Sequence, residues 1–195
     1  MKMIVTVLLG AVFVNSYGVA NAESAKPSKY AGQEKRQIKS LSEADIAELR
    51  RGGGWGLAKV AELNGLPGPA HLLELKDQIP LTAPQIVAIS KIYKSMKAKA
   101  VAQGEKLIVL ERRLDRHAKD KTITDETLRA LVAKIAVARG EQRYIHLSTH
   151  LKTPVILSAE QIEKYNALRG YAANPCAKIP AGHDPVMWRK HNNCT

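Results

Sequence analysis

The fold is decided by residues 81–119, which read LTAPQIVAISKIYKSMKAKAVAQGEKLIVLERRLDRHAK. Apolar side chains recur here every three or four residues, which predicts one long amphipathic helix over residues 83–119. Such a helix would be about 55 Å long at ~1.5 Å per residue. Lysine and arginine occupy much of the remaining surface. We expect a two-sided amphipathic helix of this length to pair with a second copy or to line an open concave surface.

Helical patterns continue on both sides of this stretch. After a turn at 120–124, a second long helix is expected at about 125–151, where Thr153-Pro154 ends it, and a shorter helix at 157–170. Three short helices are expected upstream, at about 43–51, 57–63 and 69–78. A glycine-rich loop separates the first two, and we expect its Trp55 to pack on the core. No segment alternates apolar and polar residues and aromatics make up only 5%. The chain is therefore predicted to be all-α, a long antiparallel helical hairpin with shorter flanking helices.

The N-terminus is typical of a secretory signal peptide. Lys2 gives a positive start, Ile4–Val14 is apolar, and Ala20-Asn21-Ala22 is a small-residue cleavage site. We expect cleavage after Ala22 and a periplasmic protein, although an uncleaved anchor helix is the alternative. The predicted organisation is a signal peptide at 1–22, a flexible leader at 23–40, a helical domain at 41–171 and an irregular tail at 172–195.

The chain is strongly basic, with 30 Lys and Arg against 18 Asp and Glu and a formal net charge of +12. An exported protein rarely meets nucleic acid, so we expect no nucleic-acid partner. Anionic membrane surface, envelope polyanions or acidic partner proteins are the better candidates. No internal apolar run approaches twenty residues, so no membrane span is expected after signal cleavage.

Two helix starts carry matching motifs. Leu81-Thr82-Ala83-Pro84-Gln85 opens the long helix, and Leu157-Ser158-Ala159-Glu160-Gln161 opens the last one. Each predicts a capping box, in which the Thr or Ser hydroxyl accepts from the backbone N–H of the Gln and the Gln side chain bonds back to the cap. Removing either hydroxyl should cost ~1 kcal/mol, and we expect changes to the Gln residues to cost somewhat less.

Paired LTxxQ motifs in a small, basic, exported helical chain resemble the Spy/CpxP family of periplasmic proteins. The resemblance covers about residues 70–171, although Ser158 replaces the second Thr, and the glycine-rich region and the tail are additional. It implies a thin, curved antiparallel dimer with a cradle-like face. Some members are ATP-independent chaperones, some inhibit a sensor kinase, and relatives of the ZraP and CnrX types bind zinc, or nickel and cobalt. It also implies a structural role for Leu81, Thr82, Gln85, Leu157, Ser158 and Gln161.

The functional prediction is an ATP-independent chaperone or envelope stress-response protein that holds partly unfolded, acidic clients. Basic side chains would attract the client, and their aliphatic stems, with methionine, would cover its apolar surface. The candidate client-binding residues on the long helix are Lys91, Lys94, Met96, Lys97, Arg112, Arg113 and Arg116. No arrangement typical of an enzyme occurs, so we expect no catalysis.

Metal binding is the alternative function. His146 and His150 are four residues apart on one helical face, a spacing that can chelate zinc, copper or nickel and cobalt, whereas His71 is expected to be structural. The tail adds Cys176, His183, Met187, His191 and Cys194 as possible copper or zinc ligands. A Cys176–Cys194 disulfide is the competing interpretation of the tail, because an oxidising compartment favours it. We therefore expect the disulfide and no resident cofactor.

Overall fold

The computed structural model describes residues 26–171, 179, 182–192 and 194. The chain divides into two units, Met1–Gly32 and Gln33–Thr195. The predicted signal peptide and its cleavage site lie outside the described residues. In the first unit the described residues form a turn in which the Ala31 N–H donates to the Ser28 carbonyl at 2.9 Å.

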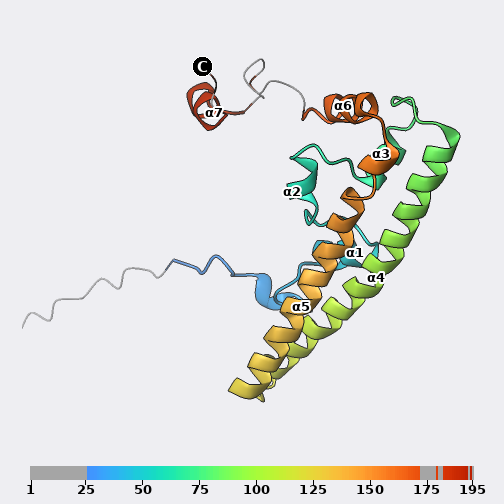
Figure 1. Cartoon of the computed structure of the whole chain (residues 1–195). Helices are drawn as coiled ribbons and strands as arrows, with labels where there is room; N and C mark the ends of the chain where they lie inside the picture. Colours follow the sequence, from blue (N-terminus) through green and yellow to red (C-terminus); the bar gives the residue numbers. More distant parts are fainter. Residues whose placement is uncertain (1–25, 172–178, 180–181, 193, 195) are drawn as a thin grey trace, which may run out of the picture. The chain divides into compact units, whose positions relative to one another are not determined.

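Two long helices dominate the second unit. Helix α4, Ala83–Lys119, and helix α5, Asp125–His150, run antiparallel beside each other (Figure 1). Thr82 and Thr124 cap their N-termini through side-chain hydrogen bonds. The connecting turn places Lys121 at a φ of +53°. The predicted hairpin is confirmed, with bounds within one residue of those expected.

Shorter helices pack against this hairpin. Helices α1 (Glu43–Arg50) and α3 (Pro69–Glu74) contact α4, and helix α2 (Lys59–Glu62) contacts α5. The remaining helices are the 3₁₀ turns η1 (Gln33–Lys35) and η2 (Pro154–Ile156), α6 (Ala159–Leu168) and α7 (Pro185–His191). The described part of the chain contains helices and no strand, which confirms the all-α class. None of its helices has the length and apolar composition needed to cross a membrane.

Two boundaries differ from the sequence-based expectation. Residues 33–40, assigned to a flexible leader, belong to the helical unit: Ile38 is fully buried and the Ser40 hydroxyl donates to Glu111 at 2.7 Å. A single apolar residue gives no periodicity, so the pattern could not show this. The tail contains α7, where the Asp184 carboxylate accepts from the N–H groups of Val186 and Met187 at 3.0 and 2.8 Å.

The core consists of three clusters along the hairpin. The largest joins Ile38, Leu41, Ile46 and Leu49 to Leu107, Ile108, Ile135 and Ala138. Trp55 packs against this cluster, as expected. Its indole N–H donates to Asp45 at 2.8 Å, and its φ of +45° is unusual for a residue other than glycine. The second cluster gathers Leu72, Ile79, Ile89 and Tyr165, and the third Met96, Ala100 and Ile145.

Helix α1 approaches α4 closely at Gly104. A Cβ at this position would lie 2.6 Å from the carbonyl oxygen of Leu49. That oxygen is backbone and cannot rotate away, so only glycine allows the two helices this separation. On α5, by contrast, a Cβ at Gly140 would meet nothing within 4 Å.

We predict that Gly104→Ala lowers the free energy of unfolding by about 1–3 kcal/mol, because the clash with α1 outweighs the better helix propensity of alanine. Gly140→Ala is the matched control and should gain up to about 1 kcal/mol when both chains are measured as monomers. Urea denaturation followed by circular dichroism measures both. If the Gly104→Ala and Gly140→Ala chains were equally stable, α1 would not lie close enough to residue 104 to exclude a side chain there.

Candidate functional site

The two matching motifs meet in space. The Gln85 side-chain amide donates to Gln161 Oε1 at 2.9 Å, and the Gln161 amide donates to Gln85 Oε1 at 3.0 Å. Each amide also donates to a carbonyl near the other motif, at Ile156 and Pro80 respectively, both at 2.8 Å. Both predicted capping boxes are present. The glutamines therefore cap their own helices and tie the start of α6 to the start of α4.

This anchoring positions α6 beside the loop that joins α2 to α3. Four consecutive residues, 65–68, each have a backbone atom bonded to a side chain from the C-terminal third of the chain. The bonds are Asn166 Nδ2 to the Gly65 carbonyl at 3.4 Å, His150 Nδ1 to the Leu66 carbonyl at 2.9 Å, Thr153 Oγ1 to the Pro67 carbonyl, and the Gly68 N–H to Tyr165 Oη at 3.4 Å. We call residues 65–68 the clamped loop.

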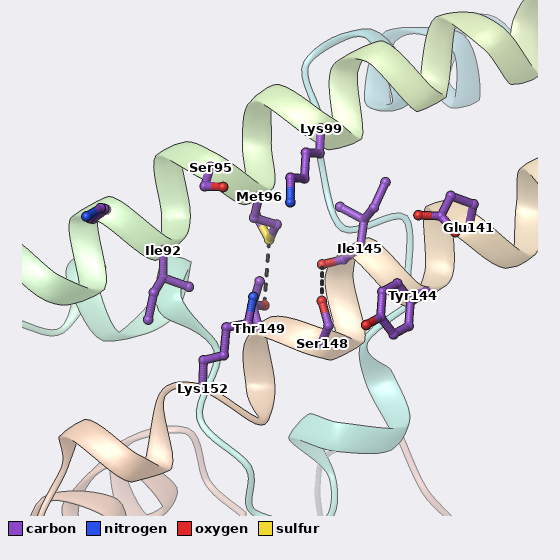
Figure 2. Close-up of a pocket in the computed structure, with 11 residues that line it drawn as sticks. Ile92, Ser95, Met96, Lys99, Glu141, Tyr144, Ile145, Ser148, Thr149 and Lys152 are labelled. Carbon is purple, nitrogen blue, oxygen red and sulfur yellow. Dashed lines mark hydrogen bonds between the residues drawn. The ribbon is translucent and has the colours of Figure 1, made fainter.

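A groove of about 330 Å³ lies between α4 and α5 (Figure 2). Ile92, Met96 and Ile145 provide apolar surface, and Tyr144, 64% exposed, lies on the α5 side. Polar lining comes from Ser95, Ser148 and Thr149, whose hydroxyl lies 3.8 Å from the Met96 sulfur. The charged lining residues are Lys91, Lys99, Lys152 and Glu141. The groove is therefore amphipathic and predominantly basic.

The structure brings together only some of the predicted client-binding residues. Lys91 lines this groove, and together with Lys94 it also lines a second hollow of α4 that includes Ile86 and Val87. Met96 also lines the groove, where it is only 8% exposed and packs in the third core cluster. The Lys97 amine lies 5.9 Å from the centroid of the Tyr93 ring. Arg112, Arg113 and Arg116 lie further along α4 and do not line the groove.

A cavity of about 280 Å³ lies on the other side of the hairpin and shares Met96 with the groove. His146 and His150 line it from α5, and His71 lines it from α3. Both α5 histidines are buried, at 3% and 4% exposure. His71 Nδ1 lies 3.1 Å from Glu62 Oε1, although without the angle of a good hydrogen bond. His71, expected to be structural, therefore faces the same cavity as the predicted metal pair.

Burial changes the acid–base properties of this region. It lowers the pKa of His146, the nearby His150 lowers it further, and Glu48 offsets part of the effect. The Nε2 atom of His146 is buried without a hydrogen-bond partner. The Leu66 carbonyl can only accept, so Nδ1 of His150 carries a proton. Burial also raises the pKa of Tyr165 to about 12, which keeps its hydroxyl neutral at the clamped loop.

Metal binding finds no ready-made site in the described residues, where no three His, Cys, Asp or Glu side chains form a group that could hold a metal ion. In the tail, the His183 ring packs edge-on to Trp188 with centroids 4.8 Å apart, and His191 Nδ1 lies 2.9 Å from the Met187 carbonyl. Cys194 is disulfide-bonded. Cys176 lies outside the described residues, so the pairing of these two cysteines stays a prediction.

Sequence analysis missed several residues that line these two surfaces. Lys99, Lys152 and Tyr144 were not selected for the groove, nor were Glu48, Glu62 and Glu74 for the cavity. For the groove a signal existed, because Glu141, Tyr144 and Ser148 share one face of α5. For the cavity none did, since its lining comes from α1–α5 and the loops between them.

We predict that Gln161→Ala lowers the free energy of unfolding by about 2 kcal/mol, because it removes a buried side-chain amide that bonds to Ser158, Gln85 and Pro80 at once. Ser158→Ala should cost only ~1 kcal/mol, which reverses the order expected from the motif alone. Combining Gln161→Ala with Gln85→Ala should reveal a coupling of about 1 kcal/mol in a double-mutant cycle. The exposed Gln78→Ala is the control, and additive effects of the two changes would contradict a direct tie.

Comparison with known proteins finds no matching family model, no matching curated sequence and no matching solved structure. The resemblance to the Spy/CpxP family therefore rests on the two motifs and on the order of the helices.

Proposed function

We propose that this chain is an ATP-independent chaperone or stress-response binding protein of the bacterial envelope, of the Spy/CpxP type. The observation that carries the proposal is the groove between α4 and α5, whose apolar lining lies among three lysines and one glutamate. Partly unfolded proteins expose apolar side chains next to charged ones, and an acidic segment of this kind complements the groove. An envelope sensor protein with an acidic surface is a second class of partner that fits the same chemistry.

The mechanism follows from the two kinds of surface. Lysine charges act over about one Debye length, ~8 Å at physiological salt, and attract an acidic segment before contact. Lys91, Lys99 and Lys152 then keep their charges in water while their aliphatic stems extend the apolar surface of the groove. An open groove of about 330 Å³ buries only a few side chains at once. Binding is therefore weak and reversible, as holding without ATP requires.

We also propose that the chain forms an antiparallel homodimer through the outer face of α5. Positions 130, 133, 137, 140, 144 and 147 of α5 and its C-cap residue 151 alternate spacings of three and four, and all of them are Ala, Gly, Val, Leu or Tyr. Val137, Tyr144 and Leu151 are 71%, 64% and 68% exposed. Such a repeat on a face that is largely exposed in the described part of the chain is typical of a coiled-coil seam.

Side-chain size supports an antiparallel arrangement. When the two-fold axis passes between Val137 and Gly140, Ala133 faces Tyr144 of the second copy and Ala130 faces Leu147. Each layer then pairs a small residue with a large one, which favours dense packing. The same arrangement brings Lys134 towards Glu141 of the second copy. That contact would neutralise Glu141 of the groove. The three lysines that line the groove would then have no carboxylate in its lining to offset their charge.

Metal binding lacks such support, because the described residues contain no group of three His, Cys, Asp or Glu side chains that could hold a metal ion. The proposed protein requires no cofactor and carries out no reaction. The aggregation assay below, run with and without a chelator, separates the two functions, since client holding should not depend on the chelator.

For client binding we predict that Lys99→Glu combined with Lys152→Glu weakens suppression of aggregation of an acidic unfolded client by about tenfold, or ~1.4 kcal/mol. Light scattering measures the suppression. Raising the salt from low to physiological concentration should weaken the wild type in the same direction. Lys106→Glu together with Lys119→Glu, on exposed positions of α4 outside the groove, is the charge-matched control. Equal losses in the two double variants would assign the effect to net charge and remove the groove from the proposal.

For assembly we predict that sedimentation shows two chains for the wild type at micromolar concentration. Val137→Glu should shift the population to monomer, because it places a carboxylate in the apolar seam. Val109→Glu alters a residue of α4 that is 55% exposed and should leave the dimer intact. A monomeric wild type, or a dimeric Val137→Glu chain, would exclude the α5 seam.

A further inference from the structure

The first half of α4 carries positive charge alone. Residues 78–104 contain four lysines, no arginine and no acidic residue. From residue 105 onwards α4 contains both signs, and each of its carboxylates pairs with a cation outside the helix: Glu105 with Arg50, Glu111 with Arg139, and Asp115 with Lys39. Among the described residues, none of the ion pairs includes Lys91, Lys94, Lys97 or Lys99. This half of the helix therefore presents a single sign of charge to its surroundings.

Two of these lysines line the second hollow of α4, which we call the outer face. Its lining residues all belong to α4 and are Ile86, Val87, Ser90, Lys91, Lys94 and Ser95. Val87 is aliphatic and is nevertheless 69% exposed. The outer face continues into the groove through Lys91 and Ser95, which line both. An exposed apolar side chain thus lies among lysines that have no carboxylate partner in the described part of the chain.

The composition of the outer face favours a lipid surface over a protein surface. Protein–protein interfaces are depleted in lysine and enriched in arginine, whose planar group binds a carboxylate through two parallel hydrogen bonds. Lysine is a flexible point charge that binds phosphate without requiring one fixed geometry. A folded acidic protein displays some positive groups among its carboxylates, whereas the headgroups of anionic phospholipids form a continuous negative surface. A lysine-only surface without a single carboxylate complements the lipid surface.

We propose that the outer face docks the chain on an anionic phospholipid bilayer. Lys91 and Lys94 place their ammonium groups among the lipid phosphates, and Lys97 and Lys99 add attraction from neighbouring positions of the helix. Val87 enters the boundary between headgroups and acyl chains, together with the aliphatic stems of the lysines. This docking does not depend on client holding, although Lys91 belongs to both surfaces.

Co-sedimentation with lipid vesicles tests the docking without any client. The chain used begins at Glu23, as expected after signal cleavage, because an apolar signal segment would itself bind lipid. It should bind vesicles of phosphatidylglycerol mixed with phosphatidylcholine at least about tenfold more strongly than vesicles of phosphatidylcholine alone. Binding should weaken as the salt rises from low to physiological concentration, because salt screens the lysine charges.

Matched variants assign the binding to the outer face. Lys91→Gln combined with Lys94→Gln should weaken binding to the anionic vesicles by about thirtyfold, since each lysine near such a surface contributes about fivefold. Lys59→Gln combined with Lys164→Gln removes the same charge from exposed positions of α2 and α6 and should have less than about a threefold effect.

A single substitution tests the apolar part of the contact. Val87→Glu places a carboxylate against the lipid phosphates and should weaken binding by at least about fivefold. Val60→Glu, at a 50% exposed position of α2, is its control. Circular dichroism shows that each variant keeps the helix content of the wild type, so that a loss of binding is not a loss of fold.

Three results would overturn the proposal. Equal losses in the two lysine double variants would assign vesicle binding to net charge, and wild-type binding by Val87→Glu would place the contact elsewhere. Absence of vesicle binding, while fluorescent polyglutamate is bound, would assign the outer face to acidic proteins. The aggregation assay contains no lipid and the vesicle assay contains no client, so failure of one proposal is distinguishable from failure of the other.

Discussion

The reciprocal hydrogen bonds between Gln85 and Gln161 are the constraint on which the functional surfaces depend. They hold the start of α6 against the start of α4 and so fix the direction in which α6 leaves the hairpin. That direction places Tyr165 and Asn166 over the clamped loop, and Arg169 next to Glu62. The loop in turn lines the histidine cavity through Gly68. A pair of helix caps therefore positions a cavity that neither motif touches.

Two surfaces of different chemistry lie on the two sides of the α4–α5 hairpin. On one side is the groove, where three lysines surround apolar side chains; on the other is the cavity, where imidazoles and paired carboxylates meet. Met96 belongs to the lining of both. Because its side chain is flexible and polarizable, it can adjust when one side changes shape. Met96 is therefore the side chain through which the two surfaces share their packing.

Periodicity predicted the elements of the fold well. The helices around the hairpin were expected within a few residues of their bounds, because 3–4 spacing and capping residues are local signals. Ile38 and α7 were missed for opposite reasons. Ile38 is a single apolar residue whose burial depends on contacts with distant helices, and α7 is short and depends on the Asp184 cap. Gly104 also looked unremarkable, although it determines how closely α1 can approach α4.

The candidate sites were harder to predict because they are products of tertiary contact. The histidine pair on α5 was visible as a spacing, but a spacing cannot show whether the rings are exposed or buried. Both rings are buried, and one of them bonds to the backbone of a loop that is more than eighty residues away in the sequence. The bond from His150 to the Leu66 carbonyl is therefore a tertiary contact that the helical spacing could not predict. No pattern of side chains predicts this contact, because the atom that accepts from His150 is a backbone carbonyl oxygen, which every residue has.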